Sequence, residues 1–187
     1  VTVGKGTVRR DFSARRDWAA SSGGATIAEF TGTDHTAGGC GPTAAIDLSR
    51  ISTWKTAAAA DEATPSNVFV PKHLTVKLPQ AITLKELAVD PSAGCFDGAS
   101  ASTAGYRIET SPDGTTWTTA NQGTFTANDL GRLNSLTPSA GTTGVQFVRF
   151  TILSNQVPNF ATDCPGPFTG CVHADLTELE VYGTPTT

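Results

Sequence analysis

The side chains best suited to chemistry in this chain are three histidines and four cysteines. His35, His73 and His173 stand far apart, and none belongs to a His-Glu-x-x-His pattern, which would place two zinc ligands on one helix face. The sequence also contains no Gly-x-Ser-x-Gly turn, no phosphate-binding glycine loop and no dinucleotide fingerprint. We therefore expect a binding module and not an enzyme, with a hydrolase as the alternative.

The four cysteines allow three disulfide pairings, and all of them lie in Gly- or Pro-rich stretches that suit disulfides better than core packing. We favour Cys164–Cys171, worth roughly 2–3 kcal/mol, and Cys40–Cys95, which closes a longer loop worth roughly 4 kcal/mol on the chain-entropy model. Two disulfides indicate an oxidising setting, so we expect a secreted, extracellular protein. The alternative is four free thiols in the cytosol. Zinc is not expected, because there is no Cys-x-x-Cys spacing.

A β-hairpin is the clearest structural element that the sequence predicts. Residues 106–109 alternate apolar and polar side chains, which indicates a half-buried strand, and Ser-Pro-Asp-Gly at 111–114 predicts a turn. Trp117 then returns on a second strand and is large enough to fill a core. Alternation predicts four further strands, over about 68–78, 81–89, 145–153 and 176–183. The pattern slips between Leu84 and Leu87, which predicts a bulge.

About eight short strands with turns between them, and no convincing helix, predict one antiparallel β-sandwich. We place the domain at 17–183, after a leader or linker segment at 1–16 and before the start of a linker at 184–187. No Met occurs in the chain, so we expect a piece of a longer protein with neighbouring domains, monomeric by itself. A net charge of -4 without a Lys/Arg stripe argues against a nucleic-acid partner. No apolar run approaches the ~20 residues of a transmembrane helix.

The hairpin, with its Tyr-x-Ile…Ser-x-Asp-Gly…Trp wording, resembles the discoidin, or coagulation-factor type C, domain family. The closing Leu-Thr-Glu-Leu-Glu-Val-Tyr-Gly resembles the last strand of that family, and Ala-Ala-Ile-Asp…Ser-Thr-Trp and Phe-Val-Arg-Phe are similar to two more of its elements. The resemblance implies a galactose-binding jelly-roll sandwich whose loops at one end bind glycans, phospholipid head groups or proteins. The wording CGPTAAIDLS with FVPKHLTVKLP is also similar to accessory domains of secreted bacterial fungalysin-type metallopeptidases.

The resemblance further implies a structural calcium ion, as in many family members. Carried over by position, Asp47 and Glu178 supply carboxylates and Ser52 a hydroxyl or carbonyl oxygen, which suits a cation that takes six to eight oxygens. Leu48 stands where the family usually has Gly, so we expect the turn after Asp47 not to adopt a positive φ cheaply. The alternative is that Asp47 caps its own turn and Glu178 faces water.

Sugar sites combine flat apolar faces with a few planar polar groups. The resemblance assigns Trp54 and Trp117 to the core, which leaves aromatic, polar and histidine side chains near the loop cysteines and the ligand end. These candidates are Phe96, Phe160, Phe168, Asp97, Asn159, His35 and His173. The alternative for each Phe is that its side chain packs inside its own disulfide loop and does not contact a ligand. We predict a non-catalytic carbohydrate- or cell-surface-binding module of a secreted bacterial protein. The alternative is a structural or protein-docking accessory domain of a secreted metallopeptidase with no glycan ligand.

Overall fold

The structure is a computed structural model that describes residues 15–60, 68–159, 162, 170 and 172–186. Within those residues it contains nine strands and five short 3₁₀ turns. The strands are β1 (Thr26–Phe30), β2 (Trp54–Ala57), β3 (Lys72–Asp90), β4 (Gly105–Ser111), β5 (Thr118–Thr124), β6 (Asn134–Leu136), β7 (Val145–Ile152), β8 (His173–Leu176) and β9 (Glu178–Pro185). The 3₁₀ turns are η1 (Ser21–Gly23), η2 (Thr36–Gly38), η3 (Pro42–Ile46), η4 (Ala99–Ala101) and η5 (Ala127–Asp129).

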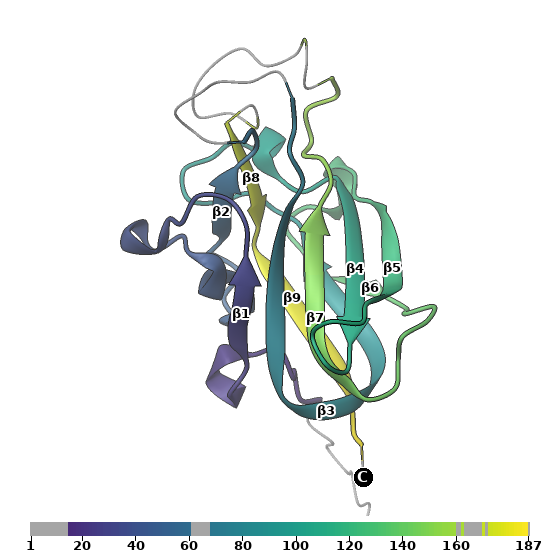
Figure 1. The fold of residues 1–187 in the computed structure, drawn as a ribbon. Coiled ribbons are helices and arrows are strands. Elements are labelled where there is room, and N and C mark those ends of the chain that lie inside the picture. Colours follow the sequence, from purple (N-terminus) through teal and green to yellow (C-terminus); the bar gives the residue numbers. More distant parts are fainter. Residues whose placement is uncertain (1–14, 61–67, 160–161, 163–169, 171, 187) are drawn as a thin grey trace, which may run out of the picture.

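The strands form two packed layers, as Figure 1 shows. One layer has the order β1-β3-β7-β4-β5 and uses the first half of β3. In the other layer, the second half of β3 pairs with β9 and β6. The strand β2 pairs with β8, and β8 leads almost directly into β9. Every pairing of named strands is antiparallel. The predicted antiparallel sandwich is confirmed.

The long strand β3 belongs to both layers. We expected separate strands at 68–78 and 81–89, but one strand runs from Lys72 to Asp90. Its ladder to β7 breaks between Lys77 and Ile82, and Pro79, which has no N–H to donate, falls in that break. The chain therefore bends from one layer to the other without ending the strand. A second shift, between Leu84 and Glu86, confirms the predicted bulge.

The two tryptophans expected in the core have different positions. Trp54 is completely buried at the start of β2, as predicted. Trp117 is only half-buried and precedes β5, where the guanidinium of Arg149 lies 3.8 Å from its ring centre. Val148 and Phe150 are completely buried, so Arg149 between them points to the outer face of the sheet. The assignment of Trp117 to the core was wrong, because Trp117 packs on this outer face.

The connections β1–β2, β3–β4 and β7–β8 gather at the end of the sandwich opposite the bend of β3 and the C-terminus (Figure 1). We call this end the loop end. Across the described residues, no helix has the length and apolar character needed to cross a membrane.

Candidate functional site

A disulfide joins two of the connections at the loop end. Cys40, in the β1–β2 connection, bonds to Cys95, in the β3–β4 connection, with a Cα–Cα distance of 6.2 Å. This confirms one predicted pairing. The other predicted pair, Cys164 and Cys171, lies outside the described residues. The bond fixes the start of a tight turn that carries the next two residues.

Phe96 is the most exposed large apolar side chain described, at 101% relative exposure. Cys95 and Phe96 have φ values of +52° and +70°, in the left-handed region that costs a residue with a Cβ atom roughly 1–2 kcal/mol. At Phe96 this strain places an aromatic ring in water, where the ring adds no packing to the fold. Backbone strain that the surroundings hold in place is characteristic of functional sites.

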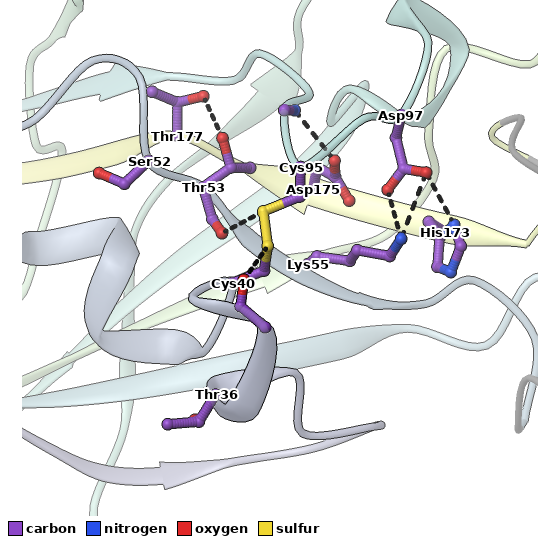
Figure 2. Close-up of a disulfide and its surroundings, with 12 residues drawn as sticks. Thr36, Cys40, Ser52, Thr53, Lys55, Cys95, Asp97, His173, Asp175 and Thr177 are labelled. Carbon is purple, nitrogen blue, oxygen red and sulfur yellow. Dashed lines mark hydrogen bonds and ion pairs between the residues drawn. A yellow bond between two sulfur atoms is a disulfide. The ribbon is translucent and has the colours of Figure 1, made fainter.

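Beneath this turn lies a buried group of charged side chains, shown in Figure 2. Asp97 Oδ2 is 3.1 Å from Lys55 Nζ, and Asp97 Oδ1 is 3.0 Å from His173 Nδ1. The side chains of Asp97, Lys55 and His173 are 0%, 14% and 8% exposed. A buried ion pair adds little net stability, but it fixes the positions of its members because breaking it leaves an uncompensated charge.

A second carboxylate, Asp175, supports the same turn from β8. Burial, and then the nearby Asp97 carboxylate, raise the pKa of Asp175 well above its ordinary value. Its Oδ2 accepts a hydrogen bond of 3.1 Å from the backbone N–H of Gly94. The turn that presents Phe96 is therefore fixed at Gly94, Cys95 and Asp97.

The two histidines expected near the ligand end lie together. The rings of His35 and His173 meet edge to face, with their centres 5.9 Å apart. His35 is half-buried in the β1–β2 connection, whereas His173 is buried at the start of β8 and not in a loop as expected. His35 is thus the less buried of the two histidines, although its Nε2 has almost no access to solvent.

The other predicted ligand residues have varied outcomes. Asp97 was expected to bind a ligand directly, but its buried carboxylate instead anchors the turn. Asn159 is exposed in the β7–β8 connection, and Phe160 and Phe168 lie outside the described residues. Sequence reasoning missed Lys55 and Asp175. In the sequence, each of them is a charged residue next to a large apolar one. Trp54 precedes Lys55 and Leu176 follows Asp175, and both apolar residues are completely buried.

The residues predicted to bind calcium also come together, below the loop end. Ser52 Oγ donates a 2.7 Å hydrogen bond to Asp47 Oδ2, and the Ser49 N–H donates to Asp47 Oδ1. Glu178 is only 1% exposed and does not face water as the alternative required. Burial, followed by the charges of Asp47 and Asp17, raises the pKa of Glu178 to about 9.

These oxygens fit a hard cation. Neither carboxylate oxygen of Glu178 accepts a well-aligned hydrogen bond among the described residues, although the backbone N–H of Leu48 lies close enough to lower the pKa of Glu178. No group of three His, Cys, Asp or Glu side chains there could hold a metal, so backbone carbonyls would have to complete a calcium shell. Leu48 nevertheless adopts a positive φ of +64°. The turn therefore keeps a conformation suited to Gly, at a cost in strain.

Comparisons with known proteins agree with this architecture. The family model described as F5/8 type C domain matches residues 26–163. Similar solved structures include CBM32-3 from a family 31 glycoside hydrolase of Clostridium perfringens, with 23% identity, TM-score 0.63, and coverage of 89% of this chain and 96% of that chain. The family 32 CBM of C. perfringens NanJ in complex with galactose has 18% identity, TM-score 0.59, and coverage of 89% and 98%.

A third similar structure is chitosan-binding module 1 of a chitosanase/glucanase from Paenibacillus sp. IK-5. It has 23% identity and TM-score 0.58, and the alignment covers 90% of this chain and 99% of that chain. No curated protein matches the chain significantly. At these identities the similarity to solved structures establishes the fold.

Proposed function

The chain belongs to the F5/8 type C domain family, and on that premise we propose that it is a non-catalytic carbohydrate-binding module whose ligand rests on Phe96. The observation that carries this proposal is the strained and completely exposed Phe96, held between a disulfide-bonded residue and a buried ion pair. Neighbours of the same fold that are described as family 32 CBM and chitosan-binding modules support it.

The chemistry of the loop end suits a sugar ring. The face of Phe96 offers a flat apolar surface for the C–H groups of a pyranose. The disulfide and the contacts of Asp97 with Lys55 and His173 hold the turn in place before a ligand binds. Such preorganisation reduces the conformational entropy that binding would otherwise cost.

We also propose that a structural calcium ion is held by Asp47, Glu178 and an oxygen of Ser52. The two carboxylates approach each other closely enough to shift the pKa of Glu178, and the Glu178 oxygens lie buried with only the Leu48 N–H nearby as a poorly aligned donor. The bound ion would balance the charge of the two carboxylates. It would tie the loop after η3 to the start of β9.

We place the parent protein outside the cell, in a bacterium. The Cys40–Cys95 disulfide supports an oxidising compartment. The similar modules from Clostridium and Paenibacillus enzymes support a bacterial accessory domain of a larger protein.

A glycan array and polysaccharide pull-downs test the proposed function. We expect binding by the native chain and loss of binding by Phe96→Ala, with an unchanged melting temperature. Ile51→Ala is the matched control, because Ile51 is 93% exposed in a different loop. No binding to any saccharide, together with stable association with a peptidase domain, would instead favour a protein-docking role.

A further inference from the structure

A groove of about 490 Å³ lies on the side of the sandwich, between the end of β5 and β6. It shares no lining residue with the Phe96 turn, and none of its residues was a candidate in the sequence. Its volume falls within the range of about 300–1,000 Å³ found for small-molecule sites. The proposed site at the loop end does not account for it.

Two stacked aromatic rings form the floor of this groove. The rings of Tyr106 and Phe125 lie 17° from parallel, with centres 4.3 Å apart, and both residues are 5% exposed. The Tyr106 hydroxyl donates a 2.9 Å hydrogen bond to Asn121 Oδ1, which fixes the ring. The two rings are therefore a rigid support beneath the groove, and they expose very little of their own surface to it.

A carboxylate and a guanidinium form part of the wall. Asp129 Oδ2 accepts hydrogen bonds of 2.8 and 2.9 Å from the N–H and hydroxyl of Thr126, in the capping box of η5. Asp129 Oδ1 lies 3.2 Å from Arg132 Nη2. The Arg132 side chain is 61% exposed, and among the described residues its only recorded hydrogen bond goes to Asp129. Its other donors therefore face the groove or solvent.

We propose that this groove is a second carbohydrate subsite, which takes a neutral hexopyranose. Vicinal hydroxyls each need a donor or an acceptor, and Arg132 and Asp129 present both side by side. Their opposite charges cancel, which disfavours ionic sugars, while the half-buried Leu133 and Leu136 of the lining offer apolar contacts to the C–H groups of the ring. With a site on Phe96, the groove would let one module bind two points of a polysaccharide and so gain avidity.

Amide chemical shifts of the ¹⁵N-labelled chain, titrated separately with galactose and N-acetylglucosamine, test this proposal. We expect saturable shifts with at least one sugar at amides 124–136. Thr124→Trp places a large ring in the groove from an exposed position and should weaken this binding at least about tenfold. Gln122→Trp adds the same ring two residues away on β5, outside the groove lining, and should leave the shifts unchanged.

The outcome separates the two sites. Phe96→Ala should abolish shifts at amides 94–98 and leave those at 124–136. If only 124–136 respond in the native chain, the groove is a subsite and the proposed Phe96 site fails. If neither sugar shifts amides 124–136, or if Thr124→Trp titrates like Gln122→Trp, the proposed subsite is refuted.

Discussion

Phe96 and Asp97 are neighbours in the chain, yet the first is 101% exposed and the side chain of the second is 0% exposed. The buried carboxylate contacts Lys55 and His173 on β2 and β8, and so anchors the exposed ring to the body of the sandwich. The presentation of Phe96 therefore depends on a residue that does not reach the surface.

Replacing Asp97 with Ala tests this dependence. The variant leaves Lys55 buried without its partner, so we expect a loss of about 3 kcal/mol in the free energy of unfolding. Glycan binding should weaken as well, under conditions where the variant remains folded. Denaturant melts measure the free energy of unfolding, and calorimetric titration measures glycan binding.

Glu29→Ala is the control. Glu29 is half-exposed and pairs with His73 and Arg149 at 3.6 Å, so this substitution should lower the free energy of unfolding by less than about 1 kcal/mol. Equal losses for both variants would contradict the anchoring role.

Removal of calcium should destabilise the protein. Because the ion binds only the folded state, a concentration one hundred times its dissociation constant adds about 2.7 kcal/mol. We expect EDTA to lower Tm in a thermal melt and calcium to restore it. Glu178→Gln should abolish the response, whereas Glu86→Gln, at an ion pair with Arg15, should retain it. If neither EDTA nor calcium changes Tm, the proposed calcium site is contradicted, and Asp47 only caps its own turn.

Leu48→Gly should stabilise the chain by about 0.5–1 kcal/mol. Relief of the left-handed strain at φ +64° is worth more than the added flexibility of the unfolded chain, and Leu48 is half-exposed, so little apolar burial is lost. Ile51→Gly is the control in the same loop. Ile51 has no positive φ, so that change should destabilise. Denaturant midpoints compare the two, and a destabilised Leu48→Gly would be inconsistent with strain at this position.

Much of the fold was predictable because it depends on local patterns. Alternation located β4, β7 and β9, and the slip between Leu84 and Leu87 located the bulge. Trp117 shows the limit. Its size suggested the core, but Arg149 from another strand offers it a partner on the outer face, which only the folded sheet reveals.

The candidate site was predictable in part for a similar reason. Phe96 and His35 stand out as loop residues, and the Cys40–Cys95 pairing follows from few alternatives. The burial of Asp97 arises from Lys55 and His173, which are far away in sequence, so no local pattern reports it. The side groove likewise forms only when the chain folds, because it brings together segments around Tyr106, Phe125 and Arg132.

Asp175 gives the stability of the protein a pH dependence of known sign. The pKa of Asp175 is raised on folding, so the folded state binds this proton more tightly than the unfolded chain does. The contribution of Asp175 to the free energy of unfolding is fully present below the ordinary Asp pKa of about 3.9. It is lost as pH rises through the pKa that Asp175 has in the folded state. Asp175→Asn is neutral at every pH and should raise Tm most at alkaline pH.

Asp113→Asn provides a control of opposite sign. Hydrogen bonds from the Thr116 and Thr115 backbone lower the pKa of Asp113, so its contribution to stability is present at neutral pH and lost in acid. Its replacement should lower Tm at neutral pH. Parallel responses of Asp175→Asn and Asp113→Asn across the pH range would contradict a raised pKa of Asp175 in the folded state.

The most direct test of the central claim is a crystal structure of the chain with the saccharide that binds best on the array. We predict a pyranose ring stacked on the face of Phe96, and the Phe96 turn unchanged from its free conformation. A saccharide found away from the loop end, with Phe96 still in solvent, would contradict the claim.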